Sequence, residues 1–139
     1  MEIIADAVQT VNAGQNVYFT DTVICGNNSI THRSNSGLVT LRGLTDQCRA
    51  RYRVTFGGNI AIPAGGAVGA IQLAIAIQGE AIPATTMIVT PAAVENFFNV
   101  HADTFIEVPR GCCITIAVEN TSTVAVLVEN ANLTVVRTA

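Results

Sequence analysis

The chain has 139 residues, the size of one ordinary domain, and 50% of them are hydrophobic. Only 12% are charged, against roughly 25% in soluble domains generally, which favours a protein whose surface is partly covered by partners. The formal net charge is -3, and the basic residues, all arginine, form no broad basic face. This balance excludes a nucleic-acid-binding role, because neutralising phosphates needs clustered cations.

The first residues, Met-Glu-Ile-Ile-Ala-Asp, carry acid where a secretory signal carries base, and their apolar run is too short for one. We expect one jelly-roll domain over residues 1–139, in which residues 1–8 form an N-terminal arm.

The rest of the chain has the pattern of short strands and turns that is typical of an all-β domain. Short alternating runs are separated by clusters of Gly, Pro, Asn and Ser, as expected for strands joined by turns. No run of twelve residues has an unbroken helical stripe, although 92–98 allows one turn. About ten short strands predict a two-sheet jelly-roll sandwich. In chain order the predicted strands are 8–11, 17–19, 30–32, 38–41, 48–56 continuing as 60–62 after a bulge or turn at Gly57-Gly58, 71–78, 81–82, 87–89, 97–108, 112–118, 124–128 and 133–136.

The strand 71–78 lacks charge on both faces. Side chains alternate in a strand, so one face carries Ile71, Leu73, Ile75 and Ile77. The other face, small and flat, carries Gln72, Ala74, Ala76 and Gln78. We expect the first face to enter the core and the second to contact another subunit, with packing inside one subunit as the alternative. On the first interpretation, Ala74→Arg or Ala76→Arg breaks the oligomer more than the fold.

The uncharged stretch 54–79 is long enough to cross a membrane, but its Gly-Gly pairs and Pro63 interrupt it. We therefore predict no membrane span.

Three arginines alternate along the predicted strand 48–56. Arg49, Arg51 and Arg53 share one face, opposite Ala50, Tyr52, Val54 and Phe56. One interpretation is an anion- or carboxylate-binding ladder; the other is a solvated face, or ion pairs to acids across a subunit boundary. Like charges two residues apart repel, so we expect Glu107, Glu119 or Glu129 nearby.

Residues for catalysis or metal binding are sparse. His32 and His101 form no metal-binding cluster, and Ser29, His32 and Asp21 lack the signature of a hydrolytic relay. With no Trp and two Tyr, the aromatic faces that sugars stack on are also scarce. We predict a non-enzymatic protein with no cofactor. Calcium could bind oxygen-bearing residues in the loops, namely Asp21, Asn27, Asn28 and Asp46. Their spacing, however, matches no known calcium-binding loop.

The four cysteines have no metal-site spacing. We expect Cys25, Cys48, Cys112 and Cys113 to be small, mostly buried hydrophobes, with a Cys25–Cys48 disulfide as the alternative.

The order of four motifs resembles the tumour-necrosis-factor-like superfamily, which includes complement-type globular heads and C-terminal domains of bacterial collagen-like spore-coat proteins. The match runs from about Gln9 to Thr138. The motifs are the opening strand and turn at 11–19, a "Y-x-V-x-F" strand at 51–56, an apolar strand with a Gln-Gly turn at 75–82, and closing strands at 124–137.

This resemblance implies a ten-strand jelly roll that forms a homotrimer round a three-fold axis. The residues assigned to the subunit contact are Tyr52, Phe56, Gln72, Ala74, Ala76 and Gln78. No Gly-X-Y stalk precedes the domain, so we expect a phage or phage-like virion surface protein, a capsid decoration or fibre head, with a capsid or fibre protein as partner. The alternative is a trimeric head on a bacterial or spore surface that binds a cell-surface ligand or receptor.

Overall fold

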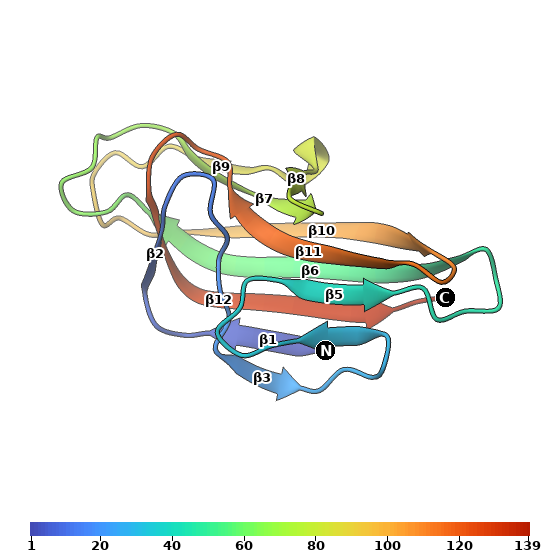
Figure 1. The fold of residues 1–139 in the computed structure, drawn as a ribbon. Coiled ribbons are helices and arrows are strands. Elements are labelled where there is room, and N and C mark those ends of the chain that lie inside the picture. Colours follow the sequence, from blue (N-terminus) through green and yellow to red (C-terminus); the bar gives the residue numbers. More distant parts are fainter.

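The computed structural model describes residues 1–139 and shows two antiparallel sheets packed face to face (Figure 1). Sheet A has the order β10-β6-β12-β1-β3, and β2 also pairs with β12. Sheet B has the order β4-β5-β11-β7-β8, and β9 also pairs with β7. The prediction of an all-β, two-sheet jelly-roll sandwich is confirmed.

The strands of sheet A are β1 (Glu2–Ala5), β2 (Gln9–Val11), β3 (Asp21–Ile24), β6 (Arg49–Ala61), β10 (Phe98–Pro109) and β12 (Val126–Arg137). Those of sheet B are β4 (Ile30–His32), β5 (Val39–Arg42), β7 (Ile71–Ile77), β8 (Glu80–Ala81), β9 (Met87–Val89) and β11 (Cys113–Asn120). The one helical element is the short 3₁₀ turn η1 (Pro83–Thr85). It falls far short of the length and apolar character that a membrane-crossing helix needs.

The core lies between the sheets and follows the period-two pattern of the long strands. In β6 every second residue from Ala50 to Ile60 is buried, while the arginines between them are exposed. Tyr52 also links the sheets, because its hydroxyl donates to the carbonyl of Arg42 on β5 at 2.6 Å, with the Ser29 carbonyl 3.3 Å away. Core packing therefore holds the ring, and the Arg42 carbonyl holds its hydroxyl.

Two predicted breaks are absent. β6 runs without interruption through Gly57 and Gly58, and Val126–Arg137 forms one strand where two were predicted at 124–128 and 133–136. The bulge lies in β12 instead, where the register to β6 shifts between Glu129 and Asn132. Asn130 adopts a left-handed φ of 54° there, a conformation that Asn tolerates better than most residues.

The N-terminal arm prediction is wrong. Residues 2–5 form β1, which pairs with β12 on one side and β3 on the other, and Ile3 is fully buried. The predicted strand at 17–19 is absent as well. Its backbone makes only isolated bonds, from Val17 to the Val118 carbonyl (2.8 Å) and from Phe19 to the Ser36 carbonyl (3.2 Å).

The tight turn predicted at Gln78-Gly79-Glu80 is confirmed. Ile77 pairs with Glu80, which leaves two loop residues. Gln78 and Gly79 have φ of 53° and 83°, as required at both positions of a type I′ hairpin turn.

A buried asparagine fastens the end of β11. The Asn120 amide donates to the carbonyls of Val11 and Val124, both at 2.9 Å, and its side-chain oxygen accepts from the Ser122 N–H at 3.0 Å. We expect Asn120→Ala to lower the free energy of unfolding by about 2–3 kcal/mol, because it leaves the Val11 and Val124 carbonyls and the Ser122 N–H without their partner. Urea unfolding measures this loss. Asn12→Ala, on an exposed turn, is the control; equal midpoints for both variants would contradict the prediction.

Candidate functional site: the outer face of sheet A

The outer face of sheet A carries the arginine ladder predicted from the sequence. The register places Arg51 opposite Glu107, Arg53 opposite Phe105, and Thr55 opposite Asp103, on the neighbouring strand β10. All these side chains point away from the core, because their neighbours along each strand are buried. The ladder therefore lies on solvent-facing sheet surface.

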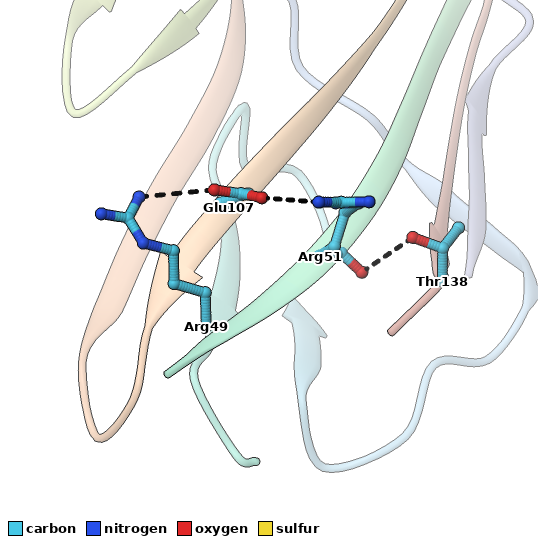
Figure 2. Close-up of polar contacts among 4 residues, drawn as sticks. All are labelled: Arg49, Arg51, Glu107 and Thr138. Carbon is cyan, nitrogen blue, oxygen red and sulfur yellow. Dashed lines mark hydrogen bonds and ion pairs between the residues drawn. The ribbon is translucent and has the colours of Figure 1, made fainter. Parts of the chain in front are cut away.

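Two of the arginines share one acid. Arg51 contacts the Glu107 carboxylate at 2.9 Å and Arg49 contacts its other oxygen at 3.4 Å. Figure 2 shows the carboxylate lying between the two guanidinium groups. The carbonyl of Arg51 accepts from the Thr138 hydroxyl at 3.3 Å, which ties the last residues of the chain to β6 (Figure 2).

The third arginine has its own partner. Arg53 reaches diagonally to Asp103, with both carboxylate oxygens within 3.1 Å of Nε, and Asp103 also accepts from the Thr55 hydroxyl at 3.2 Å. The prediction of Glu107 beside the ladder is confirmed, whereas Glu119 and Glu129 form no ion pair with it. Asp103 was not predicted, since a diagonal pair requires the strand register.

The pairing stabilises the charged form of each acid. The hydrogen bond from Arg53 holds the pKa of Asp103 below its ordinary value, with help from Thr55. The hydrogen bond from Arg51 likewise lowers the pKa of Glu107, and the charge of Arg49 adds to it. The guanidinium of Arg53 has a raised pKa for the same reason.

These shifts predict a stability that depends on acid pH. A carboxylate whose pKa is lower in the folded chain contributes stability above its unfolded pKa, and that contribution disappears as the pH falls through the folded pKa. We expect the melting temperature to fall below about pH 4, and the fall to be shallower in Asp103→Asn. Melting curves across pH test this. Glu80→Gln, which removes an acid outside any ion pair, is the control; identical pH slopes for wild type and Asp103→Asn would contradict the prediction.

An apolar strip crosses the ladder. Phe105 on β10 is 61% exposed, and Val136 on β12 is 49% exposed. Both flank Arg53, because the register pairs Arg53 with Phe105 on one side and with Val136 on the other. Arg51, Phe105 and Glu107 line an open hollow of about 470 Å³ beside the strip. Sequence reasoning missed this strip, since a phenylalanine in an alternating strand is normally assigned to the core.

The structure corrects most of the predicted subunit contact. Tyr52, Phe56 and Ala74 have no exposed surface, and Ala76 has 1%, so these four side chains are already covered within one chain. For the β7 face, the alternative of packing within one subunit is the one observed. We now expect Ala74→Arg to damage the fold itself. The two glutamines keep some exposure, but they bond within the chain: Gln72 to the Thr121 carbonyl at 3.2 Å and Gln78 to Thr115.

The prediction that the four cysteines are mostly buried is wrong. All four cysteines are exposed, and all are free thiols. Cys25 directly follows β3 and Cys48 directly precedes β6, with β1 and β12 between these strands. At roughly 5 Å per strand the separation is about 14 Å, beyond the roughly 7 Å that a disulfide allows between Cα atoms.

The other polar candidates do not converge on a reactive site. The His32 ring bonds the Ser36 carbonyl at 2.8 Å, while the Ser29 hydroxyl bonds Asn27, so the two are not joined as nucleophile and base. No group of three or more His, Cys, Asp or Glu side chains is arranged to hold a metal ion. His101 lies on the outer face of sheet A, opposite Gly57.

No protein-family model matches the chain, and no curated protein matches it in sequence. Among solved structures, the globular domain of zebrafish complement 1qA protein matches with a TM-score of 0.64 at 12% identity, covering 96% of this chain and 93% of that one. The chain has the fold of a complement-type globular domain. A carbohydrate-binding module, CBM35 from Cellvibrio japonicus Abf62, matches with a TM-score of 0.39 at 11% identity, covering 98% of this chain and 93% of that one.

Proposed function

We propose that this domain acts by self-assembly, as a homotrimer on the surface of a phage or phage-like particle. The observation that carries the proposal is the exposed strip of Phe105 and Val136 across the arginine ladder. Covering an exposed aromatic side chain with a second surface removes apolar area from water, which stabilises the assembly.

The composition of the outer face of sheet A fits a contact between subunits. Interface centres are enriched in aromatic residues and arginine and poor in lysine, and the chain contains no lysine at all. The ladder has three arginines for two acids, Asp103 and Glu107, so its pairing within one chain leaves a surplus guanidinium. That surplus is available to a carboxylate of a neighbouring subunit.

A closed three-fold assembly suits a particle surface. A homotrimer has the symmetry of a three-fold position on a capsid or of a fibre head, so it can dock there without distorting its subunits. The low charge of the chain supports a role in which much of the surface is covered. Such a protein works through shape and contact and needs no cofactor.

The alternative is a ligand- or receptor-binding head on a bacterial or spore surface. The hollow between Arg51, Phe105 and Glu107 favours it, because an exposed aromatic ring beside an ion pair suits a ligand with an apolar part and polar groups. A subunit packed on Phe105 would cover this hollow. Assembly and ligand binding at this face therefore exclude each other, which allows one experiment to separate them.

Light scattering of the wild-type protein at micromolar concentration tests the assembly. We expect the molar mass of a trimer; a stable monomer would overturn the proposal and leave the hollow open for a ligand. Fractionation of particles from the producing cells tests the location. Copurification of a trimer with capsids supports the virion role, whereas a trimer that is absent from the capsid fractions would contradict it.

A further inference from the structure

Two connections meet at one end of the sandwich, on the right in Figure 1. One joins β5 to β6 and the other joins β10 to β11. We call residues 42–49 and 109–113 together the thiol tip.

Backbone hydrogen bonds hold the thiol tip together. The Gly43 N–H donates to the Cys112 carbonyl at 2.8 Å, the Gly111 N–H to the Gly43 carbonyl at 3.0 Å, and the Arg110 N–H to the Cys48 carbonyl at 2.9 Å. The two connections therefore present their side chains from one fixed surface.

Three of the four cysteines lie on this surface, and all three are exposed. Free cysteine is among the residues most often buried, so three exposed thiols at one end of a domain are unusual. Cys113 pairs with Arg42 in sheet B, and a bond to its neighbour Cys112 would pull it out of that pairing. Cys48, Cys112 and Cys113 are all free and exposed, so each can react with a molecule from outside the chain.

The tip is also rich in positive charge. It carries Arg42, Arg49 and Arg110 but only one acid, Asp46. Arg42 and Arg110 form no ion pair, and the guanidinium of Arg110 reaches only the Asp46 carbonyl, at 3.5 Å. These cations are free to attract the carboxylates of a small molecule as it approaches the thiols.

We propose that the thiol tip is a covalent modification site for small disulfides that carry carboxylates. The thiolate of a tip cysteine attacks one sulfur of the disulfide, and the sulfur–sulfur bond of the small molecule breaks. The departing thiolate takes up the proton that the cysteine released. One protein thiol and one disulfide thus give one mixed disulfide and one small thiol, with no other oxidant. Arg49 belongs to both the tip and the arginine ladder, but the tip cysteines, Arg42 and Arg110 lie outside the ladder, so the proposal does not depend on the proposed assembly.

The test compares two small disulfides at low salt: dithiodiglycolate, which has two carboxylates, and cystamine, which has two ammonium groups. Mass spectrometry of digested samples gives the modification rate of each cysteine. Each rate is divided by that of the same cysteine in unfolded protein, which removes differences in the intrinsic reactivity of the two reagents. We expect the tip cysteines to favour dithiodiglycolate about ten-fold, and added salt to reduce this preference.

Arginine variants show whether the preference arises at the tip. Arg42→Gln and Arg110→Gln are each expected to slow the reaction of the tip cysteines with dithiodiglycolate about three-fold. Arg110→Gln is expected to leave the rate of Cys25 unchanged, whereas Arg42 is bonded to Ser29 on the same connection as Cys25 and does not give this control. Cys25 is the internal control because it lies on the connection between β3 and β4. Circular dichroism checks that both variants stay folded. Equal normalised rates for the two reagents, or folded variants with unchanged rates, would overturn the proposal.

Discussion

Replacing Phe105 by glutamate is expected to convert the proposed trimer into monomers that remain folded. The side chain is 61% exposed in one chain, so its own fold gains little from it. In a trimer formed through this face, a buried carboxylate would lie next to Glu107 and face like charges of the neighbouring subunits. Light scattering measures the change in molar mass, and thermal unfolding confirms that each chain is intact.

Ile88→Glu is the matched control for Phe105→Glu. Ile88 lies on β9 in the opposite sheet and is 60% exposed, so both substitutions place a carboxylate on an equally exposed apolar position. We expect Ile88→Glu to stay trimeric. If Phe105→Glu also stayed trimeric, the outer face of sheet A would not be the contact, and the hollow beside Phe105 would become the stronger candidate for function.

Replacing Tyr52 by alanine is expected to cost about 3–5 kcal/mol of the free energy of unfolding, the largest stability effect in the chain. The ring is fully buried near the start of β6, and its hydroxyl donates to the Arg42 carbonyl of sheet B at 2.6 Å. The substitution therefore leaves a cavity between the sheets and removes a bond that joins them. Urea unfolding followed by circular dichroism measures the loss.

Tyr52→Phe separates the two contributions. It keeps the ring and removes only the hydroxyl, so we expect a loss of about 1–2 kcal/mol from the unsatisfied Arg42 carbonyl. A loss as large as that of Tyr52→Ala would mean that the hydrogen bond, not the packing, holds the sheets together. A loss below about 1 kcal/mol for Tyr52→Ala would contradict the placement of the ring in the core.

The long central strands could be predicted because one face of each is buried, so apolar and polar residues alternate along the sequence. Alternation in 49–61 identifies both the core face and the arginine face of β6. β3 has no such pattern: all four of its residues are exposed, and it is held only by backbone bonds to β1. A strand at the edge of a sheet that buries nothing leaves no periodic signal in the sequence.

Only the arginines and Glu107 of the candidate site could be predicted from the sequence, whereas Asp103 and Phe105 could not. Side-chain alternation places Arg51 on a face, but only the register of β10 brings Glu107 opposite it and Phe105 beside it. The small-residue face of β7 was assigned to the wrong contact for the same reason, because the sequence does not show which surface covers it. Small residues such as Ala74 predict close packing correctly, yet the identity of the covering surface depends on tertiary structure, and here it belongs to the same chain.

The position of β1 has a consequence for how the protein is made. β1 is the first strand to be synthesised, but its partner β12 is the last, with Glu2 paired to Thr134 and the Met1 amine bonded to the Val135 carbonyl at 2.8 Å. Sheet A is therefore complete only when the two ends of the domain have paired. Pairing over such a sequence distance makes folding slow. Until β12 is in place, one edge of β6 has no strand beside it, and unpaired strand edges make a partly folded chain prone to aggregation.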